Sequence, residues 1–288
     1  MVCTLFSGCQ TLAPFSQSMR TRVAAARQWS GSGIEAIRRG AVREAREYFN
    51  KASSQLPQDQ EIVANVARTH FHAGEIDQAI EVMQRAISVA DDDPDLLVEL
   101  GEYYLASGRP FEANQAVERS LEKKHRLASA WLLKGKIHAA NNEHQAALGH
   151  FQKSLGIDPS SQDAQFQIVQ TYRTIGDPLR ALSAVEQLLE EYPVEQQPEY
   201  AILEKSAALV ELKQHESAIE VLTQASSRRD ISSSVFTSLA QIQILSGRKT
   251  MAWQTLQLAN GRFPNQPQIT QFMSEIRASE SPKIASRE

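Results

Sequence analysis

The sequence contains few of the residues that cross-link small or extracellular folds. Its 288 residues include only two cysteines, Cys3 and Cys9, both at the start of the chain. A disulfide or thiolate-metal framework is therefore excluded for the body of the protein. The fold must be stabilised by packing, and 42% of the residues are hydrophobic, enough for a substantial core.

Long apolar runs and an excess of positive charge are also missing. No stretch approaches the roughly 18 to 20 consecutive apolar residues that a membrane-spanning helix needs, because Glu, Gln or Arg interrupts every run within a few positions. The formal net charge is −4, whereas a nucleic-acid-binding surface would need clustered basic residues. We therefore expect neither a transmembrane helix nor a nucleic-acid partner.

Motifs of catalysis, phosphate binding and metal binding are absent as well. The sequence has no Gly-x-Ser-x-Gly or His-Glu-x-x-His pattern, and "SGSG" at 30–33 lacks the Lys-Ser/Thr ending of a phosphate loop. The acidic run 91–93 lacks the calcium-loop pattern and is interpreted as a capping turn. His144 and His150 stand six apart, about 600° around a helix, so they do not share a face as metal ligands would. We expect no enzymatic activity, cofactor, metal or small-molecule substrate.

One pattern recurs along most of the chain. Alanines are spaced by 34 residues, with a single step of 37. Bulky apolar residues stand four positions after each alanine and mostly small ones seven positions after, a stripe that predicts the buried face of a helix. Five positions before each alanine lies a residue that mostly tolerates a left-handed turn, so each unit is predicted to be helix, turn, helix. The aligned alanines are Ala45, Ala79, Ala113, Ala147, Ala181, Ala218 and Ala252, and the turn residues are Gly40, Gly74, Gly108, Asn142, Gly176, Lys213 and Gly247.

The first helix of each unit carries a matching stripe, in which a mostly bulky residue such as Trp131 is followed four positions later by a mostly small one such as Gly135. Proline or aspartate closes most units. This period, with aromatic, small and proline positions in this order, resembles the tetratricopeptide repeat family over about residues 26–266. The resemblance implies an all-α fold, a right-handed α-solenoid of about seven repeats with a C-terminal capping helix.

The predicted organisation has four parts. Residues 1–25 are expected to be a signal remnant and tether, largely disordered, and residues 26–266 to be the seven repeats. A capping helix is expected at 267–277 and a disordered tail at 278–288. The three extra residues of the 37-residue step fall in "PVEQQP", 193–198, where either a tolerated surface insertion or a bend that shapes a binding groove is possible.

The resemblance also implies a binding surface, because in this family the first helix of each repeat lines a concave face that binds extended peptides or partner helices. Arg68, Lys136 and Arg173 are expected to hold acidic or backbone groups of a ligand. The family's clamp for chaperone tails is not expected, because Glu99 and Glu102 would repel a carboxylate. The candidate groove residues are Asn65, Arg68, Lys136, Gln170 and Arg173.

The segment "MVCTLFSGCQ" at residues 1–10 resembles the end of a bacterial lipoprotein signal, in which a small residue precedes the cysteine that becomes acylated. Cys9 is then the expected lipidation site, and an upstream translation start would supply the missing basic residues. This interpretation predicts a lipid-anchored protein of the bacterial envelope. The alternative is a short disordered N-terminus on a cytoplasmic protein.

Together these features predict a non-catalytic scaffold that binds a protein partner, a peptide or a helix, in its groove and is tethered to a membrane through Cys9. Two alternatives remain open. One is an assembly lipoprotein for pili or envelope complexes, and the other is the regulatory or substrate-binding arm of an enzyme complex.

Overall fold

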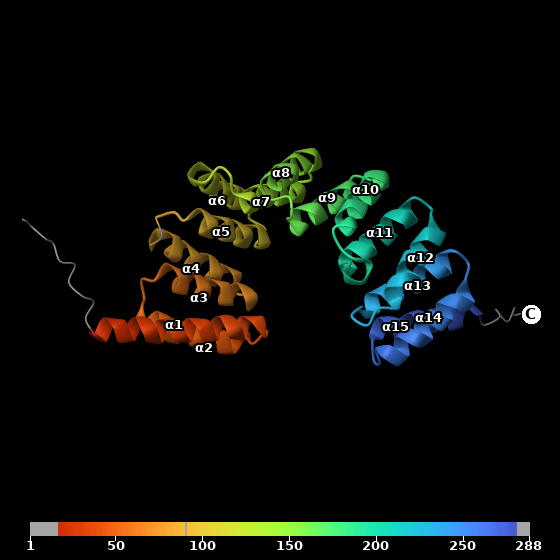
Figure 1. Cartoon of the computed structure of the whole chain (residues 1–288), viewed down its shortest axis with the longest axis horizontal. Helices are drawn as coiled ribbons and strands as arrows, with labels where there is room; N and C mark the ends of the chain where they lie inside the picture. Colours follow the sequence, from red (N-terminus) through yellow and green to blue (C-terminus); the bar gives the residue numbers. More distant parts are fainter. Residues whose placement is uncertain (1–16, 90, 281–288) are drawn as a thin grey trace, which may run out of the picture. The chain divides into compact units, whose positions relative to one another are not determined.

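The computed structural model describes residues 17–89 and 91–280, and these residues are almost entirely α-helical, with no β-strand (Figure 1). The prediction of an all-α fold made of helix pairs is confirmed. No helix in these ranges is long and apolar enough to cross a membrane. The helices are α1 (Gln17–Arg38), α2 (Val42–Gln55), α3 (Gln60–His72), α4 (Ile76–Val89), α5 (Pro94–Ala106), α6 (Pro110–Lys123), α7 (Ala128–Ala140), α8 (His144–Ile157), α9 (Gln162–Thr174), α10 (Pro178–Glu190), α11 (Glu199–Glu211), α12 (His215–Ser226), α13 (Ser233–Leu245), α14 (Lys249–Arg262) and α15 (Pro267–Glu280), with a 3-10 turn η1 (Val194–Gln196).

The chain forms two compact units, residues 1–133 and 134–288, whose boundary falls inside α7. In the first unit each helix from α1 to α6 packs against the next, and in the second unit the same holds from α8 to α15. The first helices of successive pairs also touch, as α9 touches α11 and α11 touches α13. Such nearest-neighbour packing is what a repeat architecture requires, because one pair cannot bury its apolar faces alone.

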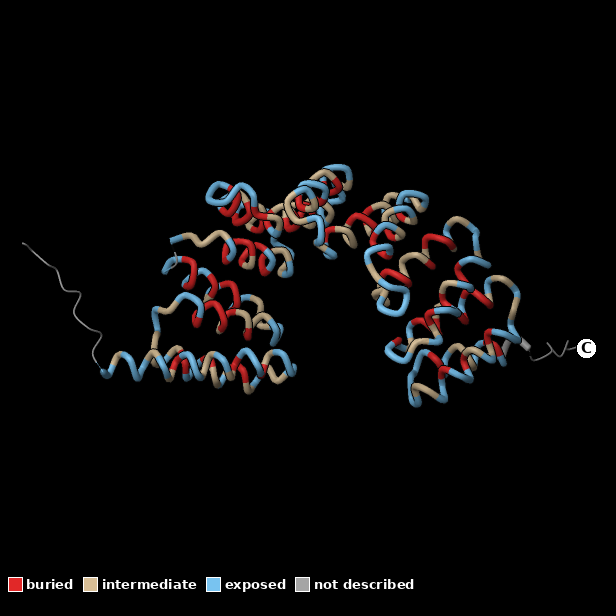
Figure 2. The backbone as a smooth tube through the Cα atoms, in the orientation of Figure 1, coloured by how far each residue is buried: buried red, intermediate tan, exposed pale blue. Residues whose placement is uncertain are grey.

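The predicted packing positions of the second helices are buried in both units. All seven aligned alanines are fully buried, and the bulky residues four positions later are at most 1% exposed. Figure 2 shows the buried positions recurring along the helices in both units. The predicted stripe is therefore confirmed. Its bulky members are Phe49, Met83, Val117, Phe151, Val185, Leu222 and Leu256.

The predicted turns between the paired helices have the expected backbone. All seven turn residues have positive φ, including the two that are not glycine, Asn142 (62°) and Lys213 (61°). Glycine adopts this left-handed conformation at no steric cost, and asparagine tolerates it. The prediction of a left-handed residue five positions before each alanine is confirmed.

Small residues on the first helices allow the paired helices to approach closely. A Cβ atom at Gly135 would lie 2.4 Å from Cε1 and 2.5 Å from Cδ1 of Phe151, and one at Gly33 would lie 2.7 Å from Cζ of Phe49. Carbon atoms in contact are normally about 3.5–4.0 Å apart. Glycine at these two positions is therefore a packing requirement.

The prediction of a disordered tether at residues 1–25 is wrong for residues 17–25, which form the beginning of α1. Arg22 holds this segment to the first repeat, because its guanidinium donates from Nε and Nη2 to the Gln55 carbonyl oxygen (3.1 and 2.5 Å). Met19 and Val23 are partly buried on the same helix. Cys9 lies outside the described residues.

The insertion at 193–198 forms the turn η1 between α10 and α11. Arg228 donates to the Gln197 carbonyl oxygen (2.6 Å), and the Gln197 amide donates to the Leu189 carbonyl oxygen (3.4 Å). The turn borders a hollow of about 260 Å³. The insertion is thus a surface turn that hydrogen bonds of Gln197 stabilise, and α10 still packs directly against α11.

Helix α15 covers the last helix pair, as predicted, and runs to Glu280. It contacts α13 and α14, and it contributes Ile269 (0% exposed) and Ile276 (3%) to their core. Arg277 lies over the Trp253 ring at 4.9 Å from its centroid. The helix removes from water an apolar face that would otherwise end the stack.

Candidate partner-binding surface

In the first unit, Arg68 on α3 joins two repeats through a network of carboxylates. Its Nε and Nη2 donate to the two carboxylate oxygens of Glu99 on α5 (2.8 and 2.7 Å). Its Nη1 donates to Glu61 (2.8 Å) and to the Asn65 side-chain oxygen (2.7 Å). Two of the predicted groove residues, Asn65 and Arg68, are therefore brought together.

This network fixes the charge of Arg68 but uses most of its donors. The hydrogen bond to Glu99 raises the pKa of Arg68, so the guanidinium stays protonated at any ordinary pH. The arginine and Glu99 side chains are each 29% exposed. With one guanidinium and two carboxylates, Glu61 and Glu99, the network carries a formal excess of one negative charge.

A similar network, with a glutamine in place of the asparagine, lies in the second unit. Arg173 on α9 donates from Nη1 to Glu204 (2.6 Å), and from Nε and Nη2 to Glu211 (3.0 and 2.8 Å), both on α11. The Gln170 amide donates to the other oxygen of Glu204. Burial lowers the pKa of Arg173, but the hydrogen bonds to Glu204 and Glu211 outweigh this and raise it. Gln170 and Arg173 thus share one partly buried carboxylate, since the Glu204 side chain is 14% exposed.

An aromatic pair accompanies each network and connects the same two helices. Phe71 on α3 stacks on Tyr103 on α5 with ring centroids 4.4 Å apart, and Phe166 on α9 meets Tyr200 on α11 edge to face at 5.0 Å. Burial raises the pKa of Tyr103, which is 4% exposed. The first-helix surface of each unit therefore consists of a fixed acid-arginine network beside an aromatic contact.

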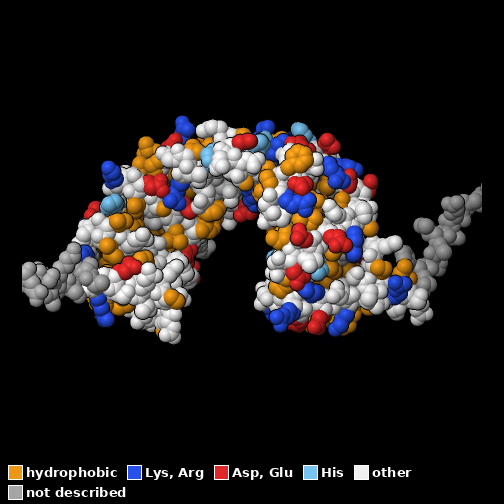
Figure 3. Space-filling view, turned by 180° about the vertical axis from the view of Figure 1, so that it is seen from behind, with side chains coloured by type: hydrophobic (Ala, Val, Ile, Leu, Met, Phe, Trp, Pro, Cys, Tyr) orange, Lys and Arg blue, Asp and Glu red, His pale blue; other side chains and the backbone are white. Residues whose placement is uncertain are grey.

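The expectation that Arg68 and Arg173 offer positive charge to an acidic ligand does not fit this geometry, because internal carboxylates already surround both guanidiniums. Lys136, the third expected cation, is partly buried on α7. Figure 3 shows acidic and basic side chains interspersed over the face in view. The two networks present excess carboxylate, and such a surface favours a ligand that donates hydrogen bonds.

The acidic partners were missed at the sequence level, although the repeat register contains the signal. Arg68 and Gln170 stand eleven residues before their aligned alanines, and Glu99 and Glu204 stand fourteen before theirs. In both networks the hydrogen-bond donor stands eleven residues before the aligned alanine of its repeat. Its acceptor stands fourteen residues before the aligned alanine of the following repeat. The polar positions of the repeat register thus contain the signal for both contacts, as the apolar positions do for the packing.

Two histidines with equivalent positions have equivalent contacts. His70 Nδ1 lies 2.6 Å from Glu75, and His138 Nδ1 lies 2.5 Å from Glu143. Glu75 also accepts from Arg46 (2.9 Å), and the hydrogen bond from His70 is the main cause of its lowered pKa. His138 is thus a packing residue with one hydrogen bond, since its ring also stacks on the ring of His150 at 4.8 Å.

Comparison with known proteins agrees with the repeat pattern. Two tetratricopeptide repeat models match the sequence, one over residues 36–97 and the other over residues 98–162. No curated protein matches the chain in sequence.

Several solved structures share the fold. A tetratricopeptide repeat protein from Parabacteroides merdae superposes with a TM-score of 0.62 at 13% identity, covering 88% of this chain and 99% of that one. For yeast Tom70 the TM-score is 0.68 at 12% identity, with 91% of this chain but only 55% of Tom70 covered. For pilF of Pseudomonas aeruginosa it is 0.58 at 12% identity, with 76% and 98% covered. At these identities the likeness shows the fold alone.

Proposed function

Because the chain belongs to the tetratricopeptide repeat family, we propose that it is a non-catalytic scaffold that binds a protein partner across the first helices of its repeats. The family's repeat stacks helices and exposes a polar face, and this supports an interaction role rather than chemistry. The partner is a peptide or a helix that lies along these faces.

The observation that carries the proposal is the pair of ordered polar networks around Arg68 and Arg173. Both cross from one first helix to the next, so a partner meets carboxylates that are already held in place. A preorganised surface reduces the entropic cost of binding. Since each network carries an excess carboxylate, the ligand groups that fit are backbone N–H groups and basic side chains.

Site-specific photocrosslinking tests which face the partner contacts. A photoreactive amino acid at Glu102, exposed on the first helix α5, should crosslink a partner in cells. The matched control is Glu81, which is also exposed but lies on the second helix α4. Crosslinks from Glu81 alone would place the interface on the second helices and contradict the proposal. If the crosslinked partner proved to be an enzyme, the result would instead favour the alternative that this chain is the regulatory or substrate-binding arm of an enzyme complex.

The membrane tether is proposed on the sequence around Cys9. A small residue, Gly8, precedes this cysteine, and acylation would anchor the chain, each buried methylene contributing about 0.8 kcal/mol. The test compares the membrane partition and mass of the native chain, expressed from its own gene with upstream DNA, with those of Cys9→Ala. Membrane binding of the native form alone supports an envelope lipoprotein, including one that assembles pili or envelope complexes. Two soluble forms would favour the cytoplasmic alternative.

A further inference from the structure

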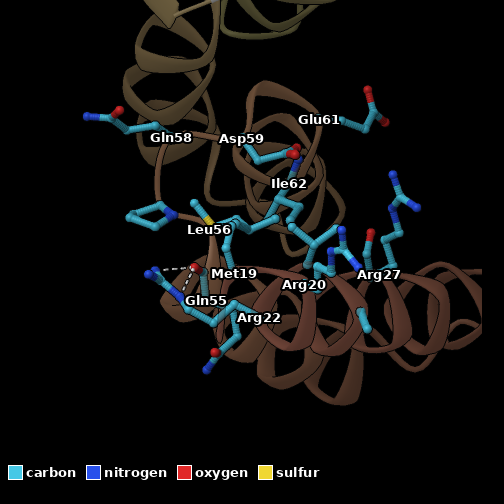
Figure 4. Close-up of a pocket in the computed structure, with 14 residues that line it drawn as sticks. Met19, Arg20, Arg22, Arg27, Gln55, Leu56, Gln58, Asp59, Glu61 and Ile62 are labelled. Atoms are coloured by element: carbon cyan, nitrogen blue, oxygen red, sulfur yellow. Dashed lines mark hydrogen bonds between the residues drawn. The ribbon is translucent and has the colours of Figure 1, made fainter. Parts of the chain in front are cut away.

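The first unit contains a hollow that shares only Glu61 with the polar network of Arg68. It has a volume of about 1040 Å³ and lies between the N-terminal part of α1, the loop from α2 to α3 and the beginning of α3 (Figure 4). Its lining is mainly apolar and includes Met19, Val23, Leu56 and Ile62. A hollow of this size and character can accept a large apolar side chain together with its backbone.

Three arginines of α1 surround this apolar lining, and two of them have no acidic partner. Arg22 is engaged with the Gln55 carbonyl oxygen, the contact drawn in Figure 4. Arg20 and Arg27 also line the hollow and are exposed, and within the part of the chain that the structure describes neither forms a hydrogen bond or an ion pair.

The acidic residues of the hollow are occupied by contacts of their own. Asp59 caps α3 by accepting from the Ile62 N–H (3.1 Å), and Glu61 is paired with Arg68 (2.8 Å). Neither carboxylate is paired with Arg20 or Arg27, and the lining holds three arginines against these two carboxylates. This is the reverse of the situation at the two polar networks.

The spacing of these arginines places them on one wall. Seven residues turn an α-helix by nearly two full turns, so Arg20 and Arg27 lie on the same face of α1, about 10 Å apart along its axis. Val23 and Ala24, which lie between them on that face, belong to the apolar lining. The wall therefore offers an apolar centre flanked by two guanidiniums.

We propose that this hollow is the anchoring subsite for a partner peptide in which a bulky apolar side chain is flanked by carboxylates. The apolar side chain fills the hollow, and the carboxylates take bidentate hydrogen bonds from Arg20 and Arg27. This assignment rests on the proposed binding function and adds the chemistry of the ligand. Residues 1–16, which precede α1 in the sequence, contain no acidic residue and therefore lack carboxylates to pair with Arg20 and Arg27. A flat membrane surface would leave the hollow unfilled.

A random peptide library displayed on phage, selected on the full chain, tests the assignment. Enriched peptides are expected to combine a bulky apolar residue with Asp or Glu nearby. Their affinity should fall about tenfold or more in Arg20→Glu/Arg27→Glu, in line with the loss of charge-assisted pairs, and less in Arg20→Gln/Arg27→Gln. Arg85→Glu, an exposed arginine on α4, is the matched control and should leave affinity unchanged.

Each other outcome has a distinct meaning. Enriched peptides that bind the Arg20→Glu/Arg27→Glu variant equally well would overturn the subsite and leave the proposed function intact. Failure to enrich any peptide would remove the proposed peptide binding, and the subsite with it. Binding to phosphatidylglycerol vesicles that is lost in the same variant, with peptide binding unchanged, would make the ligand a membrane. A large gain in peptide affinity on deleting residues 2–16 would make that segment the occupant. Either of these last two results overturns the proposal.

Discussion

Replacing Gly135 by alanine tests whether the close approach of α7 and α8 is a packing requirement. The new Cβ would lie 2.4 Å from Cε1 of Phe151, so the ring or the helix has to move by about 1 Å to reach an ordinary contact. Phe151 is fully buried, so closely packed neighbours restrict its movement. Overpacking of this kind costs about 1–3 kcal/mol, while alanine in a helix interior gains about 1 kcal/mol over glycine. We expect Gly135→Ala to lower the free energy of unfolding by up to about 2 kcal/mol.

Gly149 provides the matched control on α8, in the same helix pair. A Cβ at this position meets no heavy atom within 4 Å, so Gly149→Ala should gain only the helix-propensity term and stabilise by about 0.5–1 kcal/mol. The two glycine-to-alanine substitutions are therefore expected to have opposite signs. The difference between them depends on packing, because the change in chemistry is identical.

Urea unfolding followed by Trp131 fluorescence, in a background where Trp29 and Trp253 are replaced by phenylalanine, measures both effects, since this tryptophan lies on α7. A local probe is needed because repeat arrays can depart from two-state unfolding. Combining Gly135→Ala with Phe151→Leu should recover part of the loss, with a coupling energy of about 1 kcal/mol. If Gly135→Ala were as stable as Gly149→Ala, the close contact would not constrain the sequence and the reasoning would be refuted.

Three further predictions concern burial, the second network and pH. Ala147→Leu should lower the free energy of unfolding by about 1–3 kcal/mol through overpacking. At the exposed neighbour, Ala146→Leu should change it by no more than about 0.5 kcal/mol. Equal urea midpoints for the two variants would contradict the assignment of Ala147 to the buried face of α8. Arg173→Ala should cost about 1 kcal/mol in the same assay by leaving carboxylates unpaired, with Arg173→Lys recovering part, and no change would show that the network does not stabilise the fold. Because His70 lowers the pKa of Glu75 below its ordinary value of 4.5, the carboxylate stabilises the fold above about pH 4.5, and this contribution is lost as the pH falls through the lowered value. NMR titration of Glu75 should give a midpoint below pH 4.5, and in His70→Ala this midpoint should rise toward 4.5. An unchanged midpoint in the variant would show that His70 does not lower the pKa of Glu75.

The repeat itself could be predicted from the sequence because packing positions are restricted by size. Ala45 and its equivalents, and the left-handed turn at Lys213, follow from steric limits that apply to each repeat separately. A steric limit of this kind restricts the same positions in every repeat, so the seven repeats carry similar residues there. The capping helix followed from the same reasoning, because the last repeat needs a neighbour for its apolar face.

The contacts of polar side chains could not be predicted so directly, because each depends on what the next repeat supplies. Arg68 has the composition of a ligand-binding residue, and only the position of Glu99 shows that its charge is already neutralised. The beginning of α1 was missed for a related reason. Residues 17–25 lie before the first aligned position, and the contact that fixes them is made by Arg22 with a backbone carbonyl group, for which no side-chain pattern exists.

The offset between donor and acceptor in these networks limits how such a chain can evolve by duplication. Arg68 finds its acid in the following repeat, so copying the repeat of Arg68 in tandem would place this arginine opposite the position of Asn65, fourteen residues before the alanine. Copying the next repeat would place Glu102 opposite Glu99, a repulsive pair. Either duplication would preserve the apolar packing and damage the electrostatics. The inherited unit is thus the border between two repeats, and a tandem copy becomes compatible only after the one new border, between the original repeat and its copy, has mutated.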